Sequence, residues 1–429
     1  MKKITLSLLC LVFICSPAVP QTQPSYESTD IVSVAKTAEI LKKLAHLSLD
    51  WLMEWEGRLY IVAGPGDLAR IEQANVPCRV ETAKFYPHHS PLAVQGGING
   101  DYHSYFELET DLKALESSYP ALAKVQAIGR TPEGRNIYAL KVSANVNLDE
   151  PESRVLFVGC HHAREWISVE LPFSLGKYLL ENYAQKSEIK ALLDRSEIWL
   201  VPMVNPDGLE YTIHVYRYWR KNRRANSDGS YGVDQNRNYG YQWGYDNEGS
   251  SPEPSSEVYR GPFAFSEPET LAIRDLMLVK GFQAVVSYHS FAQDILYPWG
   301  YTTQPTAQDA SLRAIAARMS ELIRAVNGRS YTFGRAAESL YLTNGDLTDW
   351  AFGSFGIPAF TIELPPVDEI HGGFFNAEAD ISTIFQENLP AMLFLIERSI
   401  QDFRFLKEES RTDARRQDLR LRGKPQENR

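Results

Sequence analysis

The chain has 429 residues, of which 44% are hydrophobic, and its formal net charge at pH 7 is −10. This length allows one small and one large domain, and this apolar fraction supports a sizeable core. The acidic balance argues against nucleic acid as a main partner.

The first 18 residues have the pattern of a secretory signal peptide. Met1-Lys2-Lys3 precedes an apolar run, Ile4 to Cys15, which is too short to span a bilayer. Ser16-Pro17-Ala18 fits cleavage after Ala18. We therefore expect a secreted protein, extracellular or periplasmic, without a membrane partner. Of the mature cysteines, Cys78 and Cys160 lie far apart in the sequence, so we expect no disulfide.

Residues 24–90 are predicted to form a separate small α+β unit. Four apolar residues between Ile40 and Leu47 lie on one helical face, and the alternation from Trp51 to Ala63 indicates a hairpin. A strand at 31–34, a short helix at 67–74 and a strand at 76–80 complete the unit. The segment after Tyr86 has linker composition.

Residues 102–403 are predicted to form the large domain. Ser104 and Glu107 form a capping box for a helix that ends near Ser117. Strands then alternate with helices, which predicts an α/β fold with a mixed, largely parallel sheet between layers of helices. The strands are expected at 125–129, 136–143, 155–158, 198–204, 284–287 and 359–362, and the helices from 167 and at 268–280, 307–327 and 381–403.

Two segments of this part of the chain lack such periodicity. Residues 218–262 form a long loop rich in Gly, Asn, Ser and Arg, and a loop of that length in a compact domain is usually functional. Residues 407–429 are charged and nearly free of apolar side chains, so we expect a disordered tail.

Polar side chains follow two of the predicted strands. His162 and Glu165 come after the strand at 155–158, and His289 comes after the strand at 284–287. Ligands bind beyond the carboxyl ends of strands in such sheets, and nitrogen with oxygen ligands suits Zn²⁺. Each residue alone fits an ordinary polar surface position, but the combination of three favours a catalytic metal site.

Two further residues have the chemistry that such a site needs. Glu363 follows the strand at 359–362, and a carboxylate beside a metal-activated water can take its proton. The alternative for Glu363 is an ordinary ion pair. Arg237 lies between two asparagines in the long loop, and an arginine fork binds carboxylates through two hydrogen bonds. Arg223-Arg224 instead fits a solvated basic patch.

These residues belong to an ordered series of motifs that resembles the zinc carboxypeptidases of the A/B type. The match covers roughly Tyr102 to Arg398 and implies that residues 24–90 are the prosegment of a zymogen. The series is His162-Ala163-Arg164-Glu165-Trp166-Ile167, Asn205-Pro206-Asp207-Gly208, Trp219-Arg220-Lys221, Gly232-Val233-Asp234-Gln235-Asn236-Arg237-Asn238, Ser256-Glu257, His289-Ser290, Tyr297-Pro298, Asp349-Trp350 and Thr361-Ile362-Glu363-Leu364.

The resemblance implies roles for the catalytic residues. His162, Glu165 and His289 match the ligands of one zinc ion. Glu363 matches the general base. Arg220 matches the residue that polarises the scissile carbonyl and stabilises the oxyanion. Every catalytic position is filled, which argues against an inactive relative.

The resemblance also implies how the substrate is held. Asn236 and Arg237 match the clamp on the terminal carboxylate, and Tyr341 matches the mobile tyrosine that closes over it. Arg164 matches an outer contact to the substrate. Asp234 is expected to accept a hydrogen bond from His162 and so to orient it.

By the same resemblance, a pocket takes the terminal side chain of the substrate. Members specific for basic residues place an aspartate where this chain has Thr348, but Asp346 brings a carboxylate two residues earlier. We therefore expect a dual preference for bulky apolar and basic residues, as in bacterial carboxypeptidase T. The alternative is that Asp346 only bonds backbone groups. The expected pocket residues are Leu296, Gly300, Ala336, Thr343, Asp346 and Thr348.

The chain departs from the family pattern in two places. Ser230 and Ser255 stand where animal members form a disulfide, so the long loop needs other support, for which calcium is one option. Pro365-Pro366 follow Glu363 in place of the usual residues, and the loop to Phe374 is longer.

Two other functions remain open at this stage. One is a related zinc hydrolase that acts on cell-wall peptides, and the other is a secreted adhesion module, which Glu363 disfavours. For the carboxypeptidase we expect peptide and protein C-termini as substrates, an activating protease, and a monomer.

Overall fold

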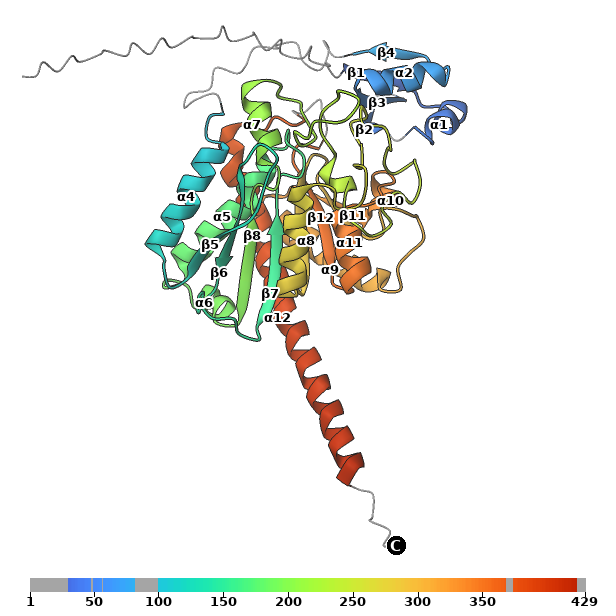
Figure 1. Cartoon of the computed structure of the whole chain (residues 1–429). Coiled ribbons are helices and arrows are strands. Elements are labelled where there is room, and N and C mark those ends of the chain that lie inside the picture. The colour runs from blue at the N-terminus through green and yellow to red at the C-terminus, as the bar shows by residue number, and fades with distance from the viewer. Residues whose placement is uncertain (1–29, 48, 56, 82–98, 368–372, 423–429) are drawn as a thin grey trace, which may run out of the picture.

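The computed structural model describes residues 30–47, 49–55, 57–81, 99–367 and 373–422. The predicted signal peptide, the linker after Tyr86 and part of the loop before Phe374 lie outside these ranges. Figure 1 shows a small N-terminal unit on top of a large domain, from which a long C-terminal helix projects downward.

The small unit is a four-stranded antiparallel sheet with two helices, as predicted. Its strand order is β2-β3-β1-β4, and its own core includes Val32, Leu44 and Ile61. The elements are β1 (Asp30–Ala35), α1 (Ala38–Leu44), β2 (Asp50–Trp55), β3 (Arg58–Ala63), α2 (Pro65–Gln73) and β4 (Cys78–Val80).

The large domain is built on an eight-stranded mixed sheet in the order β11-β10-β12-β9-β7-β8-β6-β5. The four central strands, β12, β9, β7 and β8, run parallel to one another. The strands are β5 (Ala123–Arg130), β6 (Asn136–Val142), β7 (Ser153–Val158), β8 (Ser196–Val201), β9 (Ala284–Ser290), β10 (Asp294–Tyr297), β11 (Thr332–Arg335) and β12 (Ala359–Leu364).

Helices cover both faces of this sheet. Helices α5 and α9 pack against α12 on one face, and α8 lies in front of the sheet in Figure 1. The helices are α4 (Tyr105–Ser118), α5 (Ile167–Asn182), α6 (Ser187–Leu193), α7 (Pro206–His214), η1 (Gln235–Arg237), α8 (Pro268–Lys280), α9 (Asp309–Asn327), α10 (Ala336–Ser339), α11 (Leu347–Phe355) and α12 (Glu378–Arg422).

The parallel central strands decide where polar groups gather. Their inner positions are mostly apolar, with Leu156, Phe157, Val286 and Phe360 among the buried residues. Polar side chains therefore gather mainly near the strand ends. The loop after β7 meets the ends of β9 and β12 at one edge of the sheet. This is the edge at which open α/β sheets bind ligands.

The C-terminal helix corrects one prediction. Helix α12 continues to Arg422, so residues 407–422, which we expected to be disordered, are helical. The charged residues there are mostly strong helix formers, and neither Gly nor Pro occurs before Gly423. Low apolar content therefore excluded a packed core in this segment but not a helix.

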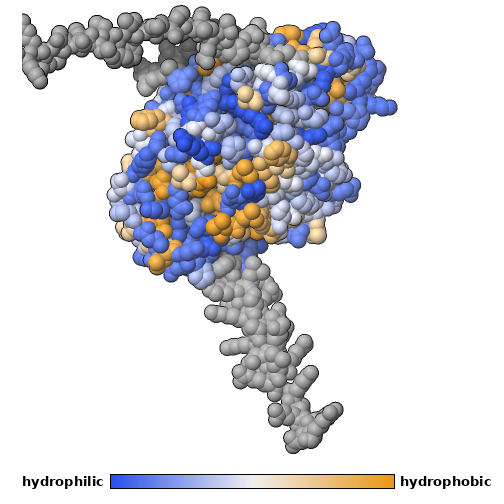
Figure 2. Space-filling view, viewed as in Figure 1, coloured by the Kyte–Doolittle hydropathy of each residue, from blue (hydrophilic) through white to orange (hydrophobic). Residues whose placement is uncertain are grey.

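The surface of the described residues is mixed. Figure 2 shows hydrophilic side chains over much of the small unit and a group of apolar ones near the centre of the large domain in that view. Among the helices in the described ranges, none is both long and apolar enough to cross a membrane.

Candidate active site

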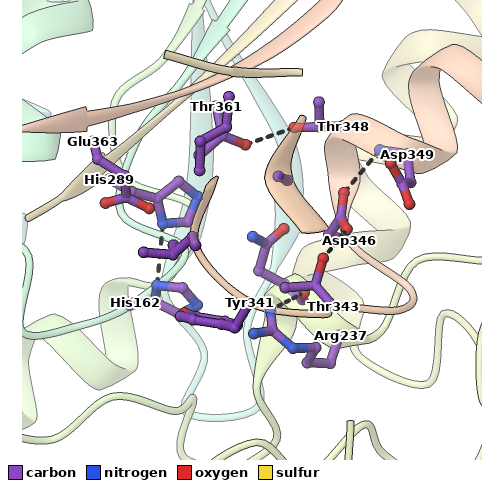
Figure 3. Close-up of a pocket in the computed structure, with 14 residues that line it drawn as sticks. His162, Arg237, His289, Tyr341, Thr343, Asp346, Thr348, Asp349, Thr361 and Glu363 are labelled. Atoms are coloured by element: carbon purple, nitrogen blue, oxygen red, sulfur yellow. Dashed lines mark hydrogen bonds between the residues drawn. The ribbon is translucent and has the colours of Figure 1, made fainter. Parts of the chain in front are cut away.

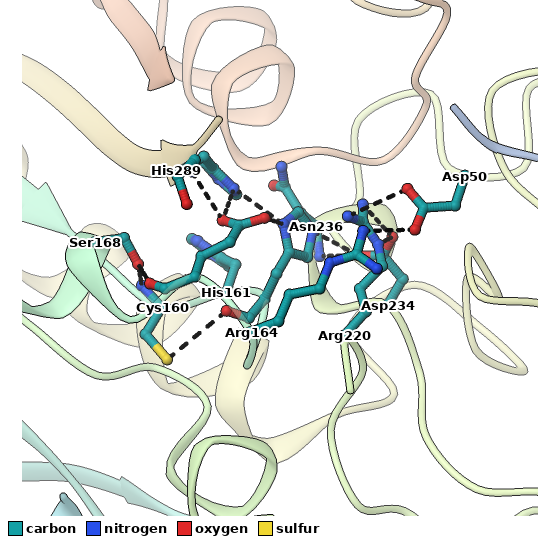
Figure 4. Close-up of polar contacts among 12 residues, drawn as sticks. Asp50, Cys160, His161, Arg164, Ser168, Arg220, Asp234, Asn236 and His289 are labelled. Carbon is teal, nitrogen blue, oxygen red and sulfur yellow. Dashed lines mark hydrogen bonds and ion pairs between the residues drawn. The ribbon is translucent and has the colours of Figure 1, made fainter. Parts of the chain in front are cut away.

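The three predicted metal ligands meet at the edge of the sheet. In Gly159, directly after β7, a Cβ would lie 2.1 Å from the Ser168 carbonyl oxygen, so only glycine lets the chain turn here. The loop then places Nδ1 of His162 2.7 Å from Glu165 Oε1. From β9, Nδ1 of His289 lies 3.0 Å from Glu165 Oε2 and 3.1 Å from Nδ1 of His162 (Figure 4).

The electrostatics of this group suit metal ligands. Burial alone would raise the pKa of Glu165, but the two facing imidazoles outweigh it and lower that pKa, so the carboxylate is charged. Burial lowers the pKa of His289, which favours the neutral ring that binds metals. One donor atom from each residue lies within 4.8 Å of the others, so the three side chains fit a single ion.

Asp234 connects the ligand His162 to Arg220. Its Oδ1 lies 3.2 Å from Nε2 of His162, and its Oδ2 accepts bonds of 3.0 and 2.9 Å from Nε and Nη2 of Arg220. Burial would raise the pKa of Asp234, but Arg220, with Arg237 and His162, holds it well below its usual range. The carboxylate is thus charged and contacts both side chains.

Glu363 lies on β12 directly opposite His289 of β9. Burial raises the pKa of its carboxyl group well above the usual value, and the nearby Glu165 and Asp294 add to this. A carboxyl group whose pKa is raised toward neutrality can both take and return a proton.

A pocket opens beside these residues, and Figure 3 shows them around it. His162, His289 and Glu363 are at one end, and Asp346 and Thr348 are at the other. The lining residues are His162, Asn236, Arg237, His289, Leu296, Ala336, Leu340, Tyr341, Thr343, Asp346, Thr348, Asp349, Thr361 and Glu363.

Arg237 is the arginine among the residues that line this pocket. It is only 2% exposed, and its Nη1 donates to the Asn236 carbonyl oxygen at 2.8 Å. Its Nε has no hydrogen-bond partner, and no carboxylate of the described residues is ion-paired with it. The Tyr341 ring lies 5.9 Å from the guanidinium. An unpaired buried arginine requires an anion, and the pocket offers space for one.

Two acidic residues form the far end of the pocket. Asp346 caps α11, with Oδ1 accepting from the Asp349 N–H at 2.7 Å and Oδ2 from the Thr343 hydroxyl at 2.7 Å. Asp349 accepts from the N–H groups of Gly300 and Tyr301. Burial raises the pKa of both carboxyl groups, and the nearby Asp346 raises that of Asp349 further.

The family model described as zinc carboxypeptidase matches residues 108–391. The chain belongs to the zinc carboxypeptidase family. It is 32% identical to a zinc carboxypeptidase of Saccharothrix mutabilis subsp. capreolus over 405 residues, which is 88% of this chain and 91% of that relative. It is 34% identical to carboxypeptidase A1 of Bos taurus over 303 residues, or 70% and 71% of the two chains.

Solved structures agree with this assignment. The crystal structure of thrombin-activatable fibrinolysis inhibitor matches with a TM-score of 0.70 at 25% identity, covering 88% of this chain and all of that one. The comparisons confirm the predicted family, the fold, the enzyme class and zinc as the metal. The more specific likeness to bacterial carboxypeptidase T stays a prediction.

Two predicted site residues of this zinc carboxypeptidase, Arg164 and Arg220, are not among the residues that line the pocket. Nη2 of Arg164 lies 2.5 Å from Asp50 Oδ2, and Nη1 of Arg220 lies 3.7 Å from Asp50 Oδ1 (Figure 4). Asp50 starts β2 of the small unit and is buried between the two guanidinium groups. Gly300 does not line the pocket, but a Cβ there would lie 2.2 Å from the Thr343 hydroxyl, so it backs the wall.

Four contributing residues were missed by the sequence reasoning. Thr361 lines the pocket two residues before Glu363, so the period-2 alternation of a strand could have placed it on the same face. Asp349 lies three residues after the helix cap Asp346, where a first-turn acid could have been expected. Leu340 and Asp50 had no local signal.

The long loop is held without a disulfide. The guanidinium of Arg223, which we had interpreted as a solvated patch, lies 3.7 Å from the Tyr211 ring centroid and 4.7 Å from those of Trp219 and Tyr231. Nζ of Lys221 donates to two backbone carbonyls of the same loop, at 3.1 and 2.9 Å. Cys78 and Cys160 are both free.

Proposed function

We propose that this chain is a secreted zinc-dependent carboxypeptidase that releases single C-terminal residues, bulky apolar or basic, from peptides. One observation carries the proposal. The buried, unpaired Arg237 lines a pocket that has the metal ligands and Glu363 at one end and Asp346 at the other. A terminal carboxylate that binds Arg237 has its side chain toward Asp346 and its last peptide bond toward Glu363.

The described residues divide the chemistry among them. His162, Glu165 and His289 would hold a zinc ion, which would supply a Lewis acid for the scissile carbonyl and would lower the pKa of a water. Glu363 takes the proton of that water and returns it to the leaving amine. Arg220 stabilises the negative charge that develops on the carbonyl oxygen.

Asn236, Arg237 and Tyr341 position the substrate. Asn236 Oδ1 accepts from the Leu347 N–H at 3.1 Å, which fixes the amide of Asn236 in the pocket wall. Arg237 holds the terminal carboxylate through a fork of hydrogen bonds, and Tyr341 closes over it. Holding the terminus in this way converts binding energy into orientation of the scissile bond.

Asp346 is proposed to give the pocket its second preference. Its two oxygens accept from the neutral donors Thr343 and the Asp349 N–H, so an entering Lys or Arg would add a positive charge next to the carboxylate. With an apolar residue in the pocket, burial favours the protonated form of this carboxyl group, because it raises the pKa of Asp346. The walls formed by Leu296 and Ala336 accept bulky apolar groups.

Residues 24–90 are proposed to be an inhibitory prosegment, removed by an activating protease that cuts near residues 88–101. Asp50 supports this, because its carboxylate forms ion pairs with Arg164 and Arg220. These are the two arginines that we assign to the substrate and the oxyanion. The predicted signal peptide supports secretion. The name of one structural relative, thrombin-activatable fibrinolysis inhibitor, says that thrombin can activate that protein.

A single assay tests the proposed activity. The processed enzyme is incubated with a peptide that ends in a free carboxylate and with its C-terminal amide. We expect release of one residue from the acid and none from the amide, because Arg237 needs an anion. Equal cleavage of both would favour the amide hydrolase that acts on cell-wall peptides, and cleavage of neither would contradict the carboxypeptidase.

A further inference from the structure

His161 precedes a metal ligand but belongs to no part of the mechanism above. Its side chain is fully buried and is stacked on His289, with ring centroids 5.6 Å apart and the planes only 8° from parallel. Its ring therefore supports the ligand that comes from β9 rather than its sequence neighbour, His162.

A chain of hydrogen bonds runs from His289 through His161 into the core. Nε2 of His289 lies 2.9 Å from the Ser287 hydroxyl, and that hydroxyl lies 3.1 Å from Nδ1 of His161. On the other side of the ring, Nε2 of His161 lies 2.8 Å from the Tyr239 hydroxyl. Ser287, His161 and Tyr239 are each at most 1% exposed.

The geometry indicates which atom donates the proton in each of these hydrogen bonds. Nδ1 of His289 faces Glu165 and His162, so it is the metal-binding nitrogen and Nε2 carries the proton. This proton is donated to Ser287, and the Ser287 hydroxyl proton is donated to Nδ1 of His161. Because Nδ1 of His161 accepts from Ser287, its Nε2 carries the ring proton and donates it to the Tyr239 hydroxyl.

We propose that His161 and Tyr239, acting through Ser287, are positioning residues for the metal ligand His289. They fix its tautomer and its ring plane and so set how tightly and in which geometry zinc is held. The inference rests on the proposed function only in taking His289 as a ligand, and its test is a measurement of metal binding.

Tyr239 also connects the ligand to the substrate pocket. Its N–H donates to the Gly345 carbonyl oxygen at 2.8 Å, directly before Asp346. Gly345 has a φ of +74°, and a Cβ there would lie 2.5 Å from the Arg237 carbonyl oxygen. The same tyrosine therefore supports His289 through its hydroxyl and the loop of the specificity pocket through its backbone.

The first measurement is the zinc dissociation constant of the full chain, obtained by competition with a chromogenic chelator. Ser287→Ala removes the bond to His289, and we expect zinc to bind about 10- to 100-fold more weakly. His161→Phe keeps an aromatic ring on His289 but removes both nitrogens, and the affinity should fall in the same direction. His161→Asn returns an acceptor near Nδ1 and should recover most of the affinity.

The second measurement uses the cobalt-substituted enzyme, whose visible absorption reports ligand geometry. Ser287→Ala and His161→Phe should shift this spectrum, and His161→Asn should restore it. In the processed enzyme kcat should fall while KM stays unchanged, because Arg237 and Asp346 are untouched. Tyr239→Phe removes one hydroxyl and should give a smaller loss of affinity in the same direction.

Ser153→Ala is the matched control. Ser153 is a buried serine of the neighbouring strand β7, bonded to Ser399 at the opposite end of the sheet. The Ser153→Ala substitution should at most lower the melting temperature, and it should leave the zinc affinity and the cobalt spectrum unchanged. The proposal is overturned if Ser287→Ala and Tyr239→Phe, like this control, leave the zinc affinity and the cobalt spectrum unchanged. If the wild type binds zinc but cleaves no peptide, the proposed function fails and this inference stands.

Discussion

At Glu363 a carboxyl group is buried opposite His289 and near a second carboxylate, Glu165. We predict that Glu363→Gln in the processed enzyme lowers kcat by roughly 10²- to 10⁴-fold, because the water loses its proton acceptor. Stopped assays on a peptide acid measure kcat, and zinc content measured on the same sample shows that the site is intact.

A neighbouring acid provides the control for this substitution. Asp294 lies opposite Glu363 in β10 and is buried, but it does not line the pocket. Asp294→Asn should therefore leave most of the turnover. Near-normal activity in a zinc-loaded Glu363→Gln enzyme would remove Glu363 from the role of the base.

Asp346 decides between two preferences of the pocket. Asparagine still caps α11, so Asp346→Asn removes the charge while keeping the helix start. We predict that kcat/KM for C-terminal Arg or Lys falls roughly 10- to 100-fold relative to Phe or Leu, because a charge-assisted hydrogen bond contributes about 1.5–3 kcal/mol. An equal loss for both substrate classes would contradict the electrostatic part of the proposal, and a wild type that cleaves no basic termini would contradict dual preference.

At the scale of elements, α2 of the small unit packs on the long loop through buried acids. Arg70 donates to Ser251 and Ser256 at 3.3 and 3.1 Å and is paired with Asp67. Burial raises the pKa of Asp67, and burial raises that of Glu257 to about 7, although Lys221 and Arg164 act against it. Asp67 and Asp50 also face Glu257 and raise its pKa.

These shifts make the contact depend on pH, and its sign follows from their direction. A carboxyl group with a raised pKa favours the packed state when protonated. Its contribution is full at acid pH and is lost as the pH rises through about 7. We predict that the uncut chain shows more residual activity, relative to the processed enzyme, at pH 8 than at pH 6.

Glu257→Gln tests this prediction because glutamine imitates the protonated acid. The ratio of uncut to processed activity should then vary much less between pH 6 and 8. Replacing the partly exposed Glu248, which pairs with the exposed His46 at 2.9 Å, gives a comparison at the rim of the same contact. A ratio that stays constant with pH in the wild type would contradict the prediction.

Local patterns could predict the elements that have strong periodicity, and they missed the short ones. The strands that carry His289 and Glu363 were expected because apolar runs precede both residues. Helix α7, which follows the strand predicted at 198–204, was not predicted. Its signals were present, because Asn205 caps it by accepting from the Gly208 N–H and Pro206 occupies its first turn. Strands β10 and β11 have four residues each, too few to show a period.

At the scale of the whole molecule, the contact between the small unit and the active site could not be read from the sequence. Asp50 is separated by 114 residues from Arg164, and only the fold brings them together. His161 was likewise invisible, because its partners Ser287 and Tyr239 come from other segments. The ligand residues were predictable because His162 and Glu165 follow one apolar strand and His289 lies at the end of another.

Asp50 gives a prediction for the zymogen. Breaking a buried ion pair by removing one partner costs about 3–5 kcal/mol, so Asp50→Asn should loosen the small unit and raise the activity of the uncut chain at least about tenfold. The assay uses a small chromogenic substrate on protein that gel electrophoresis shows to be intact. The processed enzyme lacks Asp50, so its activity sets the upper limit.

Two comparisons complete this experiment. Glu39→Gln changes an exposed carboxylate of α1 in the same unit and should have no effect on the uncut chain. The isolated 102–403 domain should be far more active than the uncut wild type. If the two are equally active, the small unit does not inhibit.

In the proposed enzyme, the short turn η1 and its flanking residues fix the distance from the bound C-terminus to the scissile bond. Asp234 holds His162 and Arg220, Asn236 holds the specificity loop, and Asn238 is anchored to the carbonyls of Arg260 and Phe263. Arg237 lies within this same rigid run. An engineer who redesigns the pocket walls would therefore alter which residue is removed, while the number removed in each round would still be one.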